Sequence, residues 1–170
     1  MARARTLPDS DVFAVILQRI AAEGEKSVAF SSISRTTGLA GASLVQRYGT
    51  LAQMVEAALT WGWDELDQMA ATAQDDAEAA EQFGAKGAQV MLKALTDLIK
   101  SLPMAALLAA SLRHAHLRPR VAAWKSTVEG MIVRDRDAAA MVFAAWQGQV
   151  LWDGLDSKGF RIKDLVKKLG

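Results

Sequence analysis

Cysteine is absent from this sequence of 170 residues, which excludes disulfides, thiolate nucleophiles and cysteine-based zinc sites together. Histidine is scarce, since His114 and His116 are the only two. Residues two apart on a helix point to different faces, so we do not expect this pair to bind a metal ion jointly. No set of nucleophile, base and orienting group can be assembled, so we expect no catalytic residues, no cofactor and no enzyme activity.

Long apolar runs are also absent. A bilayer span takes about 20 apolar residues, whereas the richest stretch here, 102–112, is interrupted by Ser111 and followed by Arg113. The N-terminus lacks the apolar core of a secretory signal, so we expect a cytoplasmic protein. Because the net charge is only +1, any binding of nucleic acid must depend on a local basic patch.

Strand-like alternation is missing as well, and apolar residues recur with helical spacing almost throughout. The sequence therefore predicts an all-α fold of about nine helices. A long helix from Leu51 is expected to end at an acidic turn around Asp75 and Asp76. The helix at 103–116 is apolar nearly all round and is expected to be buried. The other later helices are expected at 77–100, 120–132 and 138–155, with a short amphipathic one after Gly159.

The first 50 residues have the pattern of a three-helix unit that contains a helix-turn-helix. Ile33 and Leu39 are spaced to hold two short helices on a common core, and Gly38 between them supplies the backbone conformation of the turn. Leu44 and Tyr48, four residues apart, would anchor the second short helix. The next segment, Thr50-Leu-Ala-Gln53, reads as a capping box that starts the long helix. We therefore predict a helix-turn-helix domain at 1–50 and a helical effector-binding and dimerisation domain at 51–170.

This order of elements resembles the tetracycline-repressor (TetR) family of bacterial transcriptional regulators. The similarity covers about 12–59: a first amphipathic helix, a glycine, a short helix, a turn, and a recognition helix that closes on an aromatic residue. The matching positions are Gly24, Ile33, Gly38, Leu39, Leu44 and Tyr48. The resemblance implies a homodimer that binds double-stranded DNA, an effector pocket in the C-terminal part, and a dimer interface built from the last two helices.

Two positions depart from the family pattern. Val45 stands where the family usually has a tyrosine, and Leu51 stands where it usually has a lysine; in the family both commonly touch the phosphate backbone. Residues 1–58 contain six basic and five acidic side chains. A groove binder gains much of its affinity from phosphate neutralisation, so the expected affinity for DNA is modest. A dimeric helical protein that binds a small molecule and has weakened or lost DNA binding is the alternative.

The expected DNA contacts lie at the N-terminus and on the two short helices. Ser43 comes early in the recognition helix, where base edges are nearest, whereas Arg35 and Arg47 are better placed for phosphates. Arg3 and Arg5 would reach the backbone from an N-terminal arm. The predicted DNA-binding residues are therefore Arg3, Arg5, Arg35, Ser43, Gln46 and Arg47.

The C-terminal part is expected to enclose a pocket for a small apolar or aromatic effector, since tryptophans and methionines are frequent there. His114 is included as a polar group at the pocket. The predicted lining consists of Trp61, Met91, Leu95, Leu108, Leu112, His114 and Trp124.

The helix at 138–155 is apolar on most faces and lies near the end of a small chain, which predicts a symmetric dimer. The predicted interface residues are Phe143, Trp146, Val150 and Leu151. Two recognition helices related by a twofold axis would bind a palindromic operator. The sequence thus predicts a ligand-responsive DNA-binding transcriptional regulator, acting as a repressor.

Overall fold

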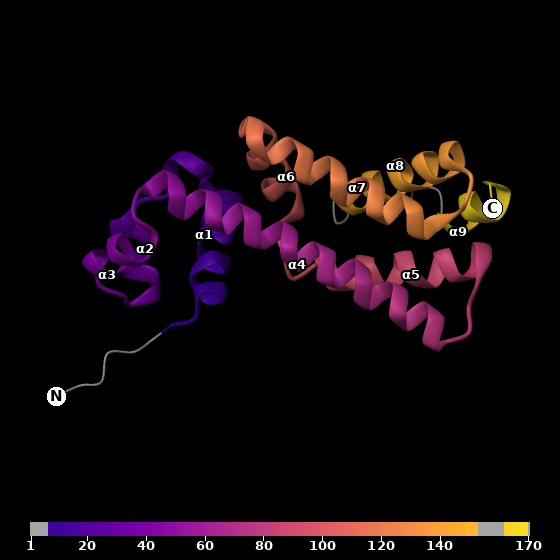
Figure 1. Cartoon of the computed structure of the whole chain (residues 1–170), viewed down its shortest axis with the longest axis horizontal. Coiled ribbons are helices and arrows are strands. Elements are labelled where there is room, and N and C mark those ends of the chain that lie inside the picture. Colours follow the sequence, from indigo (N-terminus) through magenta and orange to yellow (C-terminus); the bar gives the residue numbers. More distant parts are fainter. Residues whose placement is uncertain (1–6, 153–161, 170) are drawn as a thin grey trace. The chain divides into compact units, whose positions relative to one another are not determined.

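The structure, a computed structural model, describes residues 7–152 and 162–169, and every regular element in them is helical. This confirms the predicted all-α fold with nine α-helices (Figure 1). Two single 3₁₀ turns, η1 and η2, follow α1 and α6. The elements are α1 (Asp9–Glu23), η1 (Glu25–Ser27), α2 (Phe30–Thr37), α3 (Gly41–Tyr48), α4 (Leu51–Ala79), α5 (Gly84–Ile99), α6 (Met104–Arg113), η2 (Ala115–Leu117), α7 (Arg118–Ile132), α8 (Arg136–Trp152) and α9 (Ile162–Leu169).

The chain forms two compact units. The first unit consists of Met1–Glu65 and Leu102–Arg118, and the second consists of Leu66–Ser101 and Pro119–Gly170. The long helix α4 contributes its first half to one unit and its second half to the other. The first unit therefore contains α6 in addition to the three N-terminal helices.

In the first unit, α1, α4 and α6 meet at a glycine. The apolar stripe of α1, which includes Ile16 and Leu17, is buried. Gly62 of α4 is also buried, and a Cβ built on it would lie 3.0 Å from the methyl groups of both Leu17 and Leu107. Position 62 of α4 therefore has little room for a side chain, because side chains of α1 and α6 both approach its backbone there.

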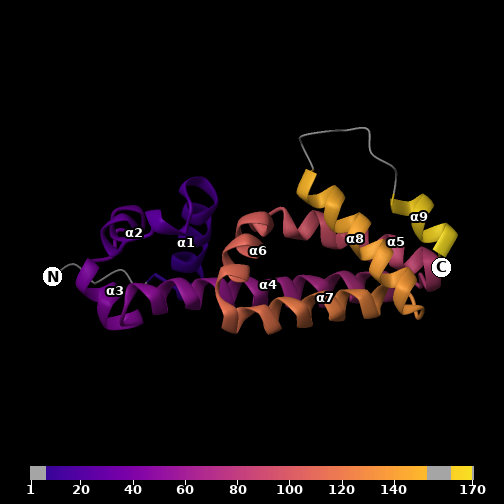
Figure 2. The same ribbon diagram turned by 90° about the horizontal axis from the view of Figure 1, so that it is seen from above.

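An aromatic cluster forms the core of the second unit. The rings of Trp124, Phe143 and Trp146 lie 5.7 to 6.3 Å apart, at tilted or edge-on angles that favour aromatic packing. Trp146 also donates its indole N–H to the hydroxyl of Thr96 at 2.8 Å, which joins α8 to α5. The last helix, α9, packs against both α5 and α8 (Figure 2).

The predicted turn at Asp75 and Asp76 is wrong, because both residues lie inside α4, which continues to Ala79. Alanines surround the two aspartates, and alanine has the highest helix propensity, so two exposed carboxylates do not end the helix. The break comes later, where Glu81 and Gly84 adopt positive φ angles of 54° and 58°. The following helix therefore begins at Gly84 rather than at residue 77.

The predicted burial of the 103–116 helix is confirmed for one face only. Met104 and Leu107 are buried in α6, whereas Leu112 is 47% exposed. None of the described helices alone is both long and apolar enough to cross a membrane; only α5 and α6 taken together, on either side of their break, have that length and composition.

Candidate nucleic-acid interface and cavities

The turn between α2 and α3 is held by side-chain hydroxyls. Gly38 adopts the left-handed conformation (φ 73°, ψ 4°) that ends α2, as its place in the sequence predicted. Ser34 donates its hydroxyl to the carbonyl of Leu39 at 2.6 Å, and the hydroxyl of Thr37 accepts the Leu39 N–H at 3.3 Å. These bonds fix the angle at which α3 leaves the turn, a role that the sequence pattern did not assign to Ser34 or Thr37.

The start of α4 has the predicted capping box. The N–H of Thr50 donates to the side chain of Gln53 at 2.9 Å, and the N–H of Gln53 donates back to the Thr50 hydroxyl at 3.2 Å. Both bonds satisfy backbone donors that the first turn of a helix leaves unpaired. The helix that follows the recognition helix is thus held at its first residue.

Most side chains of α3 point away from the protein. Leu44 is fully buried and Tyr48 is half-buried, and these two anchor the helix as predicted. Ala42, Ser43, Val45, Gln46 and Arg47 are exposed; Ala42 and Gln46 lie opposite Leu44, whereas Arg47, three positions after Leu44, lies toward the anchored side. A short helix anchored on one side and open on the other has the geometry of a helix that enters a groove.

Arg47 holds α3 to the beginning of α1. Its guanidinium donates to the carbonyl of Leu7 at 2.9 Å and lies 3.4 Å from the carboxylate of Asp9. Tyr48 donates its hydroxyl to the same carboxylate at 2.5 Å, and its ring packs 5.6 Å from that of Phe13. The structure therefore gives the guanidinium of Arg47 protein partners, whereas the sequence predicted a phosphate contact for it.

The same contacts keep the Tyr48 hydroxyl protonated. Burial of the side chain and its hydrogen bond to Asp9 raise the pKa of Tyr48 to about 12. The phenol therefore remains a donor to Asp9 at every physiological pH, and the end of α3 stays attached to α1.

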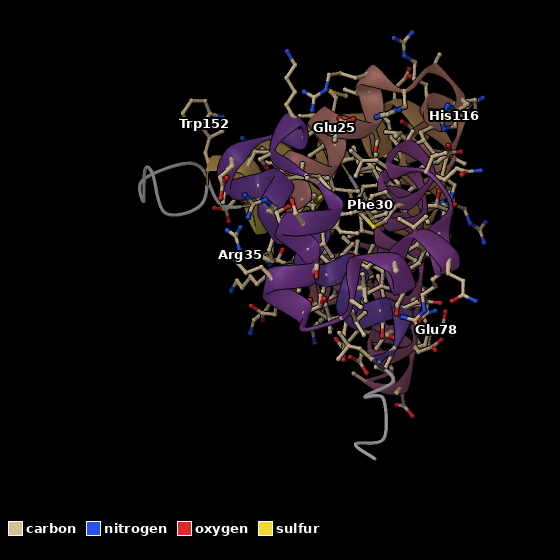
Figure 3. All side chains as sticks on the ribbon, turned by 90° about the vertical axis from the view of Figure 1, so that its left-hand side faces the viewer. Glu25, Phe30, Arg35, Glu78, His116 and Trp152 are labelled. Atoms are coloured by element: carbon tan, nitrogen blue, oxygen red, sulfur yellow. The ribbon has the colours of Figure 1, made fainter. Side chains whose placement is uncertain are left out.

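Three other predicted DNA contacts are accessible. Arg35 is exposed on the outside of α2 (Figure 3), and the structure records no hydrogen bond or ion pair for it among the described residues. Ser43 and Gln46 are exposed on α3. Arg3 and Arg5 lie outside the described residues. The interface that the described residues offer therefore consists of the open side of α3 together with Arg35.

Two of the cavities lie in the second unit and are lined by described residues. One, of about 480 Å³, lies where α4 ends, α5 begins and α7 ends, and Phe83 at its edge is 72% exposed. The other, of about 390 Å³, lies between α5 and α8, and we call it the α5–α8 groove. Its lining residues are Lys86, Gln89, Val90, Leu92, Lys93, Thr96, Trp146 and Gln149.

No protein-family model matches the sequence, and no curated protein sequence matches it. Among the solved structures that match, two are similar over nearly the whole chain. SCO7518 of Streptomyces coelicolor A3(2), a proposed transcriptional regulator, is 18% identical and superposes with a TM-score of 0.63. The match covers 95% of this chain and 96% of SCO7518. The multidrug-binding protein EbrR, solved in complex with imidazole, is 16% identical and has a TM-score of 0.65. The match covers 96% of this chain and 94% of EbrR.

The chain has a TetR-like fold. At 18% and 16% identity the similarity concerns the fold and does not extend to functional residues.

Within the TetR-like fold, the seven predicted pocket residues belong to both units. Trp61, Leu108, Leu112 and His114 lie in the first unit, and Met91, Leu95 and Trp124 lie in the second. The last three are buried in the core of that unit, and neither described cavity is lined by any of the seven. Their joint role in effector binding stays a prediction. The sequence did not predict the α5–α8 groove, because lysines and glutamines at these positions are typical of the solvent-facing side of any helix.

Contrary to the expectation from the sequence, the two histidines do not lie on different faces of one helix. Because α6 ends at Arg113, His114 and His116 do not share one helix, and their rings meet edge-on at 5.8 Å. His114 lies 2.9 Å from Glu25, and His116 lies 3.0 Å from Glu56. Among the described residues no three acidic or histidine side chains are grouped in a way that would hold a metal ion.

The predicted dimer residues lie on two sides of α8. Phe143 and Trp146 are buried in the core of their own protomer, which argues against a direct contact between these two and a second copy. Val150 is half-buried and Leu151 is 39% exposed. The outward side of α8 is also apolar: Met141 is 53% exposed and Trp152 is 65% exposed (Figure 3). Between them lie the small residues Ala144, Ala145 and Gly148.

Proposed function

We propose that this protein is a DNA-binding transcriptional regulator that acts in the cytoplasm as a ligand-responsive homodimeric repressor on a palindromic operator. The observation that carries the proposal is the exposed side of α3, anchored by Leu44 and braced by the Ser34 and Thr37 turn. The TetR-like fold over nearly the whole chain supports it, because regulators occur among the proteins with this fold.

One feature favours a second candidate. Val45 is 47% exposed and Leu51 is 37% exposed, beside the open side of the helix-turn-helix, and neither can donate a hydrogen bond to a phosphate. A dimeric small-molecule-binding protein with weakened DNA binding would tolerate such residues. Arg35 separates the two candidates, because it is the exposed cation that the proposed interface provides.

We expect an Arg35→Ala variant to bind a random-sequence duplex more weakly, with a smaller salt dependence. Loss of one phosphate contact lowers the slope of log K against log salt by about 1. The measurement is fluorescence anisotropy of a labelled duplex over a series of salt concentrations. Arg136→Ala, which removes an exposed arginine from the second unit, is the matched control and is expected to leave the slope unchanged. Absence of salt-sensitive binding by the wild type would favour the second candidate.

The α5–α8 groove is our proposed effector site. Leu92 and Trp146 are buried residues that offer an apolar and aromatic wall, and the side-chain amides of Gln89 and Gln149 add polar groups to the lining. Lys86 and Lys93 are exposed at its edge. The groove therefore suits an effector with an aromatic or apolar body and a negatively charged group. A ligand that binds one arrangement of the dimer better than another would change its affinity for the operator.

We expect 1-naphthoate to bind more tightly than the uncharged 1-naphthamide, measured by isothermal titration calorimetry. A Lys86→Ala/Lys93→Ala variant is expected to lose about fivefold in naphthoate affinity and little in naphthamide affinity, since exposed ion pairs contribute modestly. Lys26→Ala, which removes an exposed lysine of the first unit, is the control. Equal binding of both compounds by the wild type and the variant would contradict the site.

A further inference from the structure

The side of α3 opposite the buried Leu44 contains no basic residue. Arg47, the one basic residue of α3, follows Leu44 by three positions and so lies toward the anchored side, where its guanidinium contacts the Leu7 carbonyl and Asp9 at the start of α1. Arginine and lysine make the commonest specific contact to guanine, a bidentate bond to its O6 and N7. The side of α3 opposite Leu44 therefore carries no side chain suited to that contact.

The side chains that are available have a different chemistry. Ala42 and Gln46, four residues apart, lie on the side of α3 opposite Leu44, with Ser43 and Val45 to either side. All four are exposed, and the structure records no hydrogen bond for the Gln46 amide within the described residues. A glutamine amide pairs with N6 and N7 of adenine, while small apolar groups contact the methyl group of thymine.

From this set, and given the DNA binding proposed above, we infer that α3 selects half-sites rich in A·T pairs. Gln46 hydrogen-bonds an adenine in the major groove. Val45 and Ala42 pack against thymine methyl groups on adjoining pairs, and Ser43, which can serve as donor or acceptor, discriminates little. The exposure of Val45, a side chain that departs from the family pattern, thus has a role: it supplies apolar surface to a base rather than a hydrogen bond to a phosphate.

The test begins with the full-length wild-type protein and a library of random duplexes. Repeated selection is expected to enrich A·T-rich half-sites. In the selected duplex, replacement of thymidine by deoxyuridine within one half-site removes only the C5 methyl groups. Each contacted methyl is expected to contribute about fourfold in affinity. The same number of deoxyuridines placed outside the half-sites is the control and is expected to have no effect.

Two variants connect the effect to named residues. Val45→Ala is expected to bind the thymidine duplex several-fold more weakly and to respond less than the wild type to deoxyuridine, keeping only the contribution of the methyl that Ala42 contacts. A double-mutant cycle expresses the difference as coupling between the Val45 side chain and its methyl. Gln46→Ala is expected to lose about tenfold in discrimination at one adenine. Both positions are exposed and alanine favours helix, so both variants are expected to fold.

The outcomes separate the inference from the proposal on which it rests. A G·C-rich selected site, or an equal response of wild type and Val45→Ala to deoxyuridine, overturns the inferred preference of α3 for A·T pairs. Neither result contradicts the proposed DNA binding. Failure of the wild type to retain any duplex overturns both.

Discussion

A Gly148→Arg variant is expected to be a monomer at micromolar concentrations at which the wild type is a dimer. Gly148 lies among the outward apolar residues of α8, and nothing in its own protomer comes within 4 Å of a Cβ built there. An arginine at this position therefore leaves the protomer undisturbed. In a twofold interface it brings two cations together and pushes the partner helices apart. Light scattering at several concentrations measures the change.

The loss of the dimer is expected to lower operator affinity by at least 100-fold. Two heads linked in one dimer gain on the order of 10² to 10⁴ over one head, because the second binding event is intramolecular. Gly130→Arg is the matched control, since Gly130 also faces open space but lies on α7. It is expected to remain a dimer. A wild-type monomer, or a Gly148→Arg protein that dimerises as tightly as the wild type, contradicts an α8 interface.

A Gly62→Val variant is expected to be destabilised by about 3 kcal/mol. A Cβ at this position already lies 3.0 Å from methyl groups of Leu17 and Leu107, so the two further methyl groups of valine have no room. The first unit can accept them only if α1 or α6 moves away from α4, which loses packing contacts. Thermal unfolding followed by circular dichroism is expected to shift down by about 6–12 °C for a chain of this size.

Gly130→Ala is the control for this effect, because Gly130 is also helical but has open space around it. Its melting temperature is expected to rise slightly, since alanine stabilises a helix interior by about 1 kcal/mol relative to glycine. If Gly62→Val melts with the wild type, α1 and α6 do not pack tightly on α4 at this position.

The helix-turn-helix could be predicted because its signals are local. Gly38 ends one helix through its own backbone freedom, and Thr50 and Gln53 cap another through bonds between residues three apart. Leu44 and Tyr48 lie on one side of α3 by helical spacing alone. Such features depend on neighbours along the chain, so composition and spacing are sufficient to predict them.

The role of Arg47 could not be predicted in this way. Its partner carbonyl belongs to Leu7, 40 residues earlier, and its other partner is Asp9. From the sequence it is a basic residue on a recognition helix, for which a phosphate contact is the ordinary expectation. Only the packing of α3 beside the start of α1 brings its guanidinium to these protein oxygens, and its contact with a phosphate stays a prediction.

By itself, the sequence determined the helical class, the order of the helices and the anchoring side of α3, because each follows from periodicity and caps within one segment. The tertiary structure alone decided which side of α8 is core. That helix is apolar on nearly all sides, so periodicity does not distinguish Phe143 and Trp146 from Met141 and Trp152. Packing against Trp124 and the hydrogen bond from Trp146 to Thr96 bury the first pair and leave the second pair exposed.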